Sequence, residues 1–413
     1  MTDFGIELTV VPENTAPSEG AARRQSFLQA PFWGGLKSLY GWTVFRFRVT
    51  LSLRGREGEA VFPVQVLVRR FLHILSLAYV PMGPDPDFSG LILPEETPRV
   101  LTADFYAGLL AKTAAALRQF LPGNVYCIRF DPPWNRENVF VSGMRGTGLL
   151  RKKTAFTPEL RKAAGDVQPP DTVLLDLRSG AEAVFAAMKP KWRYNIRLSE
   201  KKGVQTLCFR GPEAQKPAPA LVPPGFAGTP PSPLDVFYTL YEETAARDGI
   251  AIHGKSYYAS LFSVCAGSAS GADLRLYAAV HEGDVLAAVI TLFYGTQAVY
   301  LYGASCGKKR ALMPAYALQW RAIRDAGEAG CSDYDFYGIP PSDDVHHPMY
   351  GLYRFKTGFG GNIVHRCGSL DAPYKPFLYR FLRLAEGVRS FWFKSVRKAF
   401  RRAGKSGSGN GGS

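Results

Sequence analysis

The chain lacks any long, uninterrupted run of apolar residues. The longest candidate, residues 71–82, contains His73 and Pro81 and falls short of the roughly 20 residues that a membrane-spanning helix needs. The first twenty residues also lack the basic start and the following apolar stretch of a secretion signal. We therefore expect a cytoplasmic protein without a membrane span.

Closely spaced cysteines are absent too. The six cysteines form no CxxC pair, so nothing predicts a structural zinc site, and we expect reduced thiols. The polar group Asp343, Asp344, His346 and His347 lies among prolines, without further ligands at a recognisable spacing. We expect no metal there and no bound cofactor. There is also no GxSxG or Cys–His pattern of a nucleophilic enzyme.

Acidic residues are few relative to basic ones. The 35 Asp and Glu face 50 Lys and Arg, which gives a net charge of +15. Such a surplus indicates an anionic partner, with nucleic acid, nucleotide and lipid headgroup all open. Residues 375–405 hold ten Lys or Arg against Glu386 alone, interleaved with large apolar residues. This pattern is typical of a basic amphipathic helix. We expect its first half to dock on the core and its second half to contact an anionic membrane or nucleic acid.

At 413 residues the chain is long enough for two domains. Each half shows strand patterns, then a helix, then a short strand. In the first half these are residues 43–53, 60–69, 73–80, 102–120 and 126–130, and in the second half 274–280, 285–294, 298–302, 314–329 and 334–337. We divide the chain into a first domain at 1–165, completed by 367–400, and a second at 166–366. The Pro-rich residues 211–233 are interpreted as a flexible surface insertion, and 401–413 as a flexible tail.

Residues 188–204, MKPKWRYNIRLSEKKGV, predict a basic helix. Proline is tolerated in a first turn and glycine commonly ends a helix, which fits Pro190 and Gly203. The four-residue spacing places one set of cations on a single face, namely Lys189, Arg193, Arg197 and Lys201. Like charges at this spacing repel by roughly a few tenths of a kcal/mol per pair. An anionic partner would offset that repulsion, whereas the alternative is an ordinary solvated face.

This basic segment and a second one, GLYRFKTGFGG at residues 351–361, resemble the FemABX family of peptidoglycan peptidyltransferases. The resemblance runs from about Phe27 to about Leu370. It implies an α/β (α+β) protein with two tandem GNAT-like acyl-CoA N-acyltransferase domains, in agreement with the repeated pattern of strands and helix. No sustained heptad pattern is present, so the chain resembles a family member without the long coiled-coil arm.

The resemblance also implies a reaction. The family moves an amino acid from aminoacyl-tRNA to the stem-peptide amine of a peptidoglycan precursor, either lipid II or UDP-MurNAc-pentapeptide. The charged tRNA is then a co-substrate. Coenzyme A fits less well, because the loop that would hold its pyrophosphate reads RALMPA at residues 310–315. Met313 stands where glycine lets the backbone approach phosphate, and Pro314 removes an N–H donor.

Catalytic candidates follow from matching the family motifs. The resemblance places Lys356 at the reacting centre, where a cation can stabilise the tetrahedral oxyanion, and Phe355 beside it. The alternative for Lys356 is a surface lysine on a short helix. Asp131 in IRFDPPW matches a family aspartate with a base or positioning role. Because Asp-Pro also ends strands for local reasons, we favour the local interpretation of Asp131.

Acceptor-binding candidates are matched in the same way. Lys37, four residues after Trp33, matches a family lysine that contacts the diphosphate, and Tyr302 matches a tyrosine that faces the stem peptide. In both cases an ordinary lysine or strand aromatic is the alternative. The family has an arginine four residues before Tyr257, where this chain has His253. This departure suggests a phosphate contact that is weaker, pH-dependent or shifted to Arg247 or Lys255.

We thus predict an aminoacyltransferase, monomeric and peripheral to the inner face of the plasma membrane through the basic C-terminal helix. Two other classes stay open. One is a GNAT-fold N-acyltransferase that acts on another polymer or a small amine. The other is a non-catalytic protein that binds nucleic acid or a membrane surface.

Overall fold

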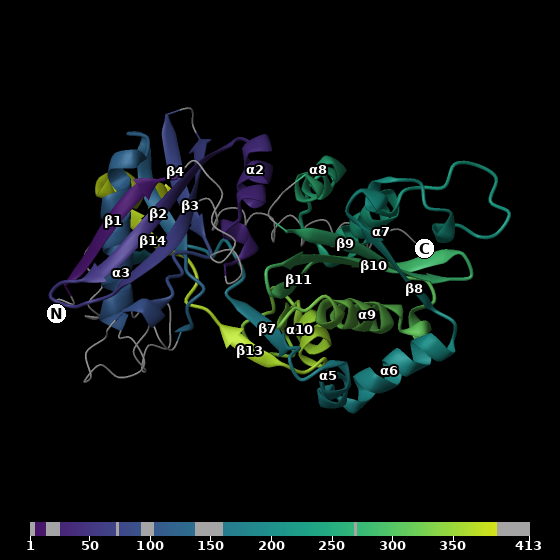
Figure 1. Cartoon of the computed structure of the whole chain (residues 1–413). Coiled ribbons are helices and arrows are strands. Elements are labelled where there is room, and N and C mark those ends of the chain that lie inside the picture. The colour runs from purple at the N-terminus through teal and green to yellow at the C-terminus, as the bar shows by residue number, and fades with distance from the viewer. Residues whose placement is uncertain are drawn as a thin grey trace, which may run out of the picture.

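Two seven-stranded sheets lie side by side in the computed structural model (Figure 1). It describes residues 5–13, 25–71, 74–91, 103–136, 160–267 and 271–385. No helix in these ranges is both long and apolar enough to cross a bilayer.

The first sheet has the order β1-β2-β3-β4-β5-β14-β6. Its strands are β1 (Ile6–Pro12), β2 (Trp42–Leu53), β3 (Glu59–Phe71), β4 (Leu75–Pro81), β5 (Val125–Asp131), β6 (Arg161–Lys162) and β14 (Leu370–Pro373). All neighbours are antiparallel except β4 and β5, which are joined by the crossover helix α3 (Ala103–Leu117). Parallel neighbours need such a crossover.

The second sheet has the order β13-β7-β12-β11-β10-β9-β8. Its strands β8 to β12 are neighbours in chain order, as β1 to β5 are in the first sheet. The strands of the second sheet are β7 (Asp171–Asp176), β8 (Gln205–Arg210), β9 (Asp273–His281), β10 (Asp284–Tyr294), β11 (Gln297–Ser305), β12 (Asp333–Asp335) and β13 (Asn362–His365). Here β11 and β12 are the parallel pair, joined through α9 (Pro314–Glu328). The predicted α/β fold with two GNAT-like halves and no long arm is confirmed for the described residues.

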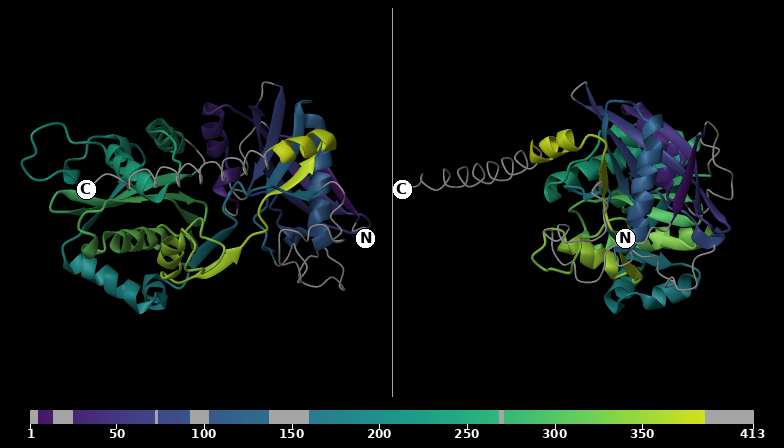
Figure 2. Two further views of the ribbon diagram at one scale, coloured as in Figure 1. Left: turned by 180° about the vertical axis from the view of Figure 1, so that it is seen from behind. Right: turned by 90° about the vertical axis from the view of Figure 1, so that its left-hand side faces the viewer.

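Within the described ranges, the chain crosses between the halves twice. It leaves the first sheet after β6 and enters the second at β7, and it returns from β13 to β14 in the first sheet (Figure 2). Residues 376–385 then form a helix on the first half. The boundary expected at 165/166 lies between β6 and β7, and the return segment expected at 367–400 includes β14. Residues 386–400 and the tail at 401–413 lie outside the described ranges.

Helices cover both faces of each sheet. The other helices are α2 (Pro31–Leu39), α5 (Ala181–Ala187), α6 (Pro190–Lys201), α7 (Pro233–Asp248), α8 (Lys255–Ala266) and α10 (Tyr350–Thr357). Short 3₁₀ turns are η1 (Phe27–Gln29), η2 (Phe88–Gly90), η3 (Arg118–Phe120), η5 (Gly211–Gln215), η6 (Pro219–Leu221) and η7 (Arg310–Leu312). In the first half, α3 packs on one face, and η1 and α2 pack on the other.

One apolar cluster joins the halves. It combines η1 and α2 of the first half with α7, α8 and β9–β11 of the second. The other face of the second sheet, which does not take part in this cluster, packs against α6 and α9. The shared cluster holds α2 against α8, and this contact positions the site described below.

Two expectations about local structure differ from the result. The Pro-rich segment 211–233, interpreted as a flexible insertion, buries Ala218 and Leu221 against Ala278 and Val280 of β9. The strand expected at 334–337 ends at Asp335, because the next carbonyls turn towards a buried lysine instead of a neighbouring strand.

Candidate active site

Lys356 lies in α10 and is only 4% exposed. Its Nζ donates to the backbone carbonyls of Phe336 at 2.7 Å, Tyr337 at 2.7 Å and Gly338 at 2.8 Å. The alternative interpretation of a surface lysine is therefore wrong. Burial lowers the pKa of Lys356 to about 7, against the opposing effect of Asp335.

The turn held by Lys356 has an unusual backbone. Tyr337 has φ 48° and Gly338 φ 77°, and this left-handed region is uncommon for a residue with a side chain. The geometry points three carbonyls at one ammonium, which has three N–H donors. Lys356 therefore holds the turn after β12, and contact with a developing oxyanion would require it to release one carbonyl.

Phe355 forms part of the packing behind Lys356. Its ring is partly buried and contacts Tyr316 and Phe359 edge-on, at 5.2 Å between centroids in both pairs. Its carbonyl accepts a hydrogen bond from Trp192 Nε1 at 2.9 Å. Phe355 thus links α10 to the basic helix α6.

The two motifs that carry the family resemblance form one structural unit. Besides the Trp192 bond, the backbone N–H of Lys189 donates to the carbonyl of Gly358 at 3.0 Å. A Cβ at Gly358 would lie 2.0 Å from the Trp192 ring. Only glycine permits this approach, so the start of α6 packs directly on the glycine-rich turn after α10.

The basic helix at 190–201 is confirmed, but its four cations are not equivalent. Arg193 Nη1 donates to the carbonyls of Ala186 at 2.6 Å and Met188 at 2.7 Å, which satisfies the end of α5. Arg197 is exposed and lies over the ring of Phe185. Lys189 and Lys201 are exposed as well. Arg193 is therefore structural in this state, and the other three face solvent.

A second group of predicted residues surrounds Lys37. Its Nζ donates to Tyr257 Oη at 3.0 Å and lies 4.6 Å from the centroid of the Trp33 ring. His253 stacks on the Tyr257 ring at 4.0 Å between centroids. The Tyr258 ring lies between Tyr257 and Tyr302, at 5.7 Å and 5.1 Å between centroids. The structure thus brings together Trp33 and Lys37 of α2 with three residues of the second half.

Burial controls the charge of this group. It lowers the pKa of Lys37 to about 8, with a smaller contribution from Arg69. Burial followed by the nearby Lys37 lowers the pKa of His253. A half-buried ammonium beside aromatic rings and hydroxyls can receive a phosphate oxygen, because the anion compensates for the hydration that burial removes.

The remaining acceptor candidates lie apart from Lys37. Arg247 donates to Asp248 Oδ1 and the Ser305 carbonyl, both at 3.0 Å. Lys255 pairs with Asp235 at 2.7 Å. Both cations thus form exposed ion pairs in this structure, whereas Lys37 and His253 both contact Tyr257.

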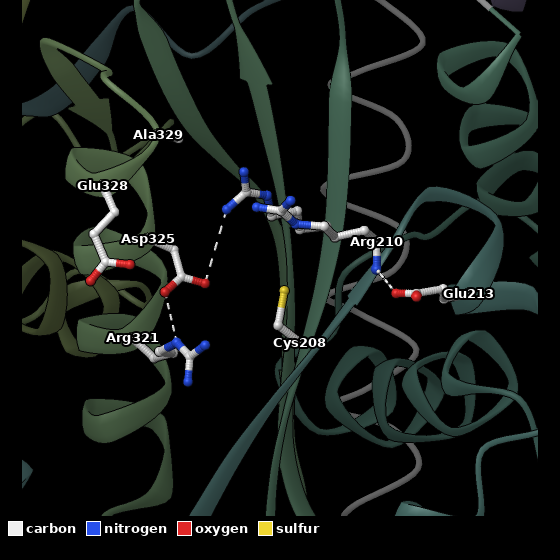
Figure 3. A pocket seen from close by; sticks show the side chains of 8 residues that line it. Cys208, Arg210, Glu213, Arg321, Asp325, Glu328 and Ala329 are labelled. Atoms are coloured by element: carbon white, nitrogen blue, oxygen red, sulfur yellow. Dashed lines mark hydrogen bonds and ion pairs between the residues drawn. The ribbon is translucent and has the colours of Figure 1, made fainter.

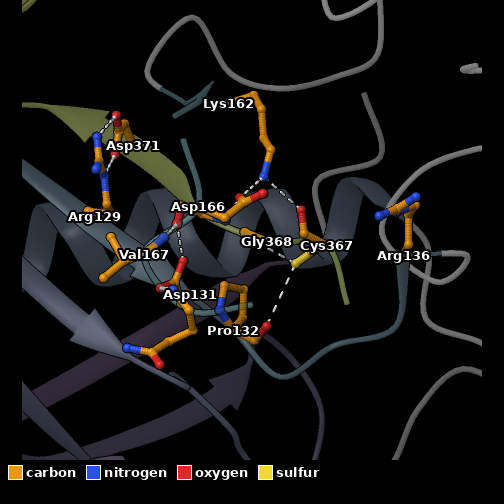
Figure 4. Close-up of polar contacts among 12 residues, drawn as sticks. Arg129, Asp131, Pro132, Arg136, Lys162, Asp166, Val167, Cys367, Gly368 and Asp371 are labelled. Atoms are coloured by element: carbon orange, nitrogen blue, oxygen red, sulfur yellow. Dashed lines mark hydrogen bonds and ion pairs between the residues drawn. The ribbon is translucent and has the colours of Figure 1, made fainter. Parts of the chain in front are cut away.

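Asp131 is buried at the end of β5 (Figure 4). Its carboxylate accepts hydrogen bonds from Tyr79 Oη at 2.5 Å, the Gln168 backbone N–H at 3.2 Å and the Ser369 hydroxyl. Burial raises the pKa of Asp131 against these bonds. Since both oxygens are engaged, Asp131 acts here by fixing its neighbours, which is more than the strand-ending role that we favoured.

A chain of side chains connects the two halves through Gln168. Its Nε2 donates to Tyr79 Oη at 3.2 Å, and its Oε1 accepts a hydrogen bond from the Tyr337 hydroxyl. Tyr337 in turn belongs to the turn held by Lys356. The network therefore runs from Asp131 in the first half to Lys356 in the second.

An aromatic path connects the Lys37 group to the same turn. The Phe27 ring lies 5.2 Å from Trp33 and 6.3 Å from Tyr337 between centroids. Lys37 and Lys356 thus belong to one continuous region between the halves, with Tyr337 between them.

Sequence reasoning missed Tyr79, Gln168 and Tyr337. Tyr79 and Tyr337 lie in stretches that predict strands, where an aromatic residue is ordinary, and Gln168 lies in a Pro-rich boundary segment. Nothing in the sequence indicates that Tyr337 has a left-handed backbone. The Tyr-Gly pair at the end of a predicted strand was the available signal for a turn.

A polar cavity of about 440 Å³ lies elsewhere, between β8, β9 and the C-terminal half of α9 (Figure 3). Its charged lining is Arg210, Glu213, Arg275, Arg321, Asp325 and Glu328. Arg275 is bound to Asp273 and Arg321 to Asp325. Because positive and negative groups balance, this cavity has no surplus charge for phosphate, and none of the predicted site residues lines it.

Two further expectations concern metal and coenzyme A. Among the described residues, no group of three or more His, Cys, Asp and Glu is placed to hold a metal. At the RALMPA loop, Met313 has φ 54° and Pro314 is the first residue of α9. The start of this helix thus lacks both the glycine and one N–H donor of a pyrophosphate loop.

Comparisons with known proteins agree on one family. The model of the FemAB family matches residues 19–269 and 275–387. The chain is 32% identical over 416 aligned residues to the lipid II:glycine glycyltransferase of Staphylococcus saprophyticus, covering 86% of this chain and 90% of that protein. The enzyme of the same name from Staphylococcus aureus is 32% identical over 101 residues. The crystal structure of FemX superposes with a TM-score of 0.63 at 18% identity, over 88% of this chain and 97% of that chain.

Proposed function

Because this chain belongs to the FemAB family, we propose that it is an aminoacyltransferase that extends the stem peptide of a peptidoglycan precursor. The predicted family and the transferase class are confirmed by the comparisons. The substrates are our proposal. The observation that supports it most strongly is the joining of the Lys37 group and the Lys356 turn into one region between the halves.

The Lys37 group is proposed to bind the acceptor. Both lipid II and UDP-MurNAc-pentapeptide carry a diphosphate, and a phosphate oxygen at Lys37 Nζ would replace its present bond to Tyr257. The freed Tyr257 hydroxyl and the ring of Trp33 remain beside the ligand. A lipid-linked acceptor would place the enzyme at the inner face of the membrane.

The donor is proposed to be aminoacyl-tRNA. The exposed cations Lys189, Arg197 and Lys201 of α6 can contact its phosphates, and α6 is seated on the glycine-rich turn beside Lys356. Phosphate contacts along α6 would therefore bring the aminoacyl end towards the Lys356 turn. No cofactor is needed.

The chemical step forms one amide and breaks one ester. The acceptor amine, after losing a proton from its ammonium form, attacks the aminoacyl carbonyl carbon. The developing oxyanion needs a positive neighbour, which Lys356 can supply by exchanging one of its three carbonyl partners. The tRNA hydroxyl then leaves with a proton. Alignment of two large substrates between the halves supplies much of the rate.

Mass spectrometry tests this function directly. A stem-pentapeptide precursor, nucleotide-linked in one sample and lipid-linked in another, is incubated with the protein and tRNA charged with mixed amino acids. We expect a mass gain that identifies the amino acid and the acceptor. No gain with either acceptor, from folded protein that still binds tRNA, would favour a non-catalytic binding protein. A gain from acyl-CoA on another amine would favour the alternative acyltransferase.

A further inference from the structure

The helix at residues 376–385 has one face anchored on the first sheet. Tyr379 is buried, and its hydroxyl donates to Asp371 Oδ2 of β14 at 2.8 Å. Arg383 Nη1 donates to the Lys162 carbonyl of β6 at 2.8 Å. These two bonds fix the rotation of the helix about its axis. The expectation that this segment docks on the core is therefore correct for this face.

The opposite face is apolar and uncovered. Phe377 is 86% exposed, Phe381 67% and Leu384 70%. Their spacing of four and three residues places them on one side of a helix. Single exposed apolar residues are ordinary, whereas a contiguous apolar stripe marks an interaction site.

The surroundings of this stripe are basic. Lys375 and Arg380 are exposed beside it. The sequence that follows the described residues, 386–413, is basic as well, with seven Lys or Arg and one acid, Glu386. A large apolar stripe flanked by cations matches the interface of an anionic bilayer, where rings enter the headgroup region and cations meet lipid phosphates.

We propose that Phe377, Phe381 and Leu384 form a membrane-docking stripe that inserts into the surface of an anionic bilayer. The charge of this segment favours a bilayer over a second copy of the chain or an RNA. A second copy of the chain would bring two strongly basic segments together, and RNA phosphates would gain nothing from the apolar side chains. The expected division of the segment is thus revised, because its first half both docks on the core and presents a face to the membrane.

The stripe lies on the same side of the first sheet as Lys37. Leu77 of β4 lines the cavity beneath the 376–385 helix, and Tyr79, two residues further along β4, packs in the cluster that contains α2. Alternate residues of a strand share a face, so the helix and α2 cover one face of this sheet. The inference rests on the proposed function in one respect, since it gives the side from which a lipid-linked acceptor reaches the Lys37 group.

Vesicle flotation with the full chain tests the stripe. The variant carries Phe377→Ser, Phe381→Ser and Leu384→Ser and keeps all ten C-terminal cations. Its matched control carries Val61→Ser, Ile74→Ser and Val345→Ser, which are also exposed apolar residues, at 55%, 69% and 62%. Vesicles contain phosphatidylcholine alone or mixed with phosphatidylglycerol, without any peptidoglycan precursor.

We expect wild type and control to float with the anionic vesicles and the stripe variant to lose about tenfold or more of this binding. The stripe variant should keep its activity on the soluble nucleotide-linked acceptor, so membrane docking and catalysis are measured separately. Equal binding by all three proteins, or no binding by wild type, would overturn the proposal. So would a wild-type dimer in sedimentation that the stripe variant abolishes, because a second copy would then occupy the stripe.

Discussion

Two lysines, the buried Lys356 and the half-buried Lys37, define the site at the scale of single residues. Burial lowers the pKa of both, to about 7 for Lys356 and about 8 for Lys37. The two environments differ, because Lys356 is surrounded by carbonyls and Lys37 by aromatic rings and a hydroxyl. The first arrangement fixes a turn, whereas the second leaves the ammonium available to a ligand.

Substituting Lys356 with Met should reduce both stability and turnover. Three carbonyls lose their donor, and each unpaired buried group costs about 1–3 kcal/mol. If the ammonium also meets the oxyanion, kcat should fall about 10²- to 10³-fold. Thermal unfolding and single-turnover rates measure the two effects. The matched control is Arg366→Met, which removes the bond from Arg366 Nη2 to Asp335 Oδ2 at 3.3 Å and keeps the three bonds of Lys356 Nζ. Equal kcat in both folded variants would limit Lys356 to holding the turn.

Acceptor binding should weaken as the pH rises through about 8. An anion favours the charged form of Lys37, so affinity is full while Lys37 is protonated and declines above its free-state pKa of about 8. Calorimetry with UDP-MurNAc-pentapeptide from neutral to alkaline pH measures this decline. Lys37→Arg stays protonated throughout and should give a flatter profile. A wild-type affinity that does not change with pH would remove Lys37 from the diphosphate site.

At the scale of elements, α6 and α10 act as one unit. Trp192 is the contact residue, since its ring covers Gly358 and its Nε1 binds the Phe355 carbonyl. The cations of α6 are thereby held in a fixed position relative to Lys356. A substitution at the contact between Trp192 and Gly358 should therefore affect both the cations of α6 and Lys356.

Gly358→Ala should separate the two elements. The new Cβ would meet the Trp192 ring at 2.0 Å, and such overpacking costs about 1–3 kcal/mol. We expect a lower melting temperature and weaker transfer from charged tRNA. Gly351→Ala lies within α10, whereas Gly358 follows its last residue. No atom lies within 4 Å of a Cβ at Gly351, so this substitution should be neutral or slightly stabilising. Equal melting temperatures for the two variants would contradict the close contact.

At the scale of the whole molecule, the net charge of +15 is divided among surfaces with different tasks. The basic helix α6 lies on the second half, and the 376–385 helix lies on the first. The apolar cluster shared by η1, α2, α7 and α8 keeps these halves together. We interpret the first surface as facing RNA and the second as facing lipid.

Binding of tRNA should depend on salt through α6. The double variant Arg197→Glu and Lys201→Glu should weaken binding and lower the slope of log affinity against log salt by about 2. Arg193 is left unchanged because it supports α5. The control Lys216→Glu and Lys308→Glu carries the same charge change on other exposed positions. Filter binding over a salt series gives the slopes, and identical slopes in both variants would exclude α6 from the RNA contact.

The family, the repeated topology and most elements follow from the sequence by itself. Hydrophobic periodicity is local, so it predicted α9 and the long strands. The spacing of cations between Pro190 and Gly203 predicted α6, and the two motifs predicted the family. Their spacing of about 150 residues gave no sign that Trp192 packs on Gly358, because contact between distant segments depends on the whole fold.

Tertiary structure alone decided how the candidate residues are used. In the sequence, nothing distinguishes Lys356 from a surface lysine, Arg193 from a surface arginine or Phe377 from a core aromatic. Packing buried the first under three carbonyls, turned the second to the end of α5 and left the third in solvent. Burial and hydrogen bonding are properties of the folded neighbourhood, and that neighbourhood is assembled from segments of both halves.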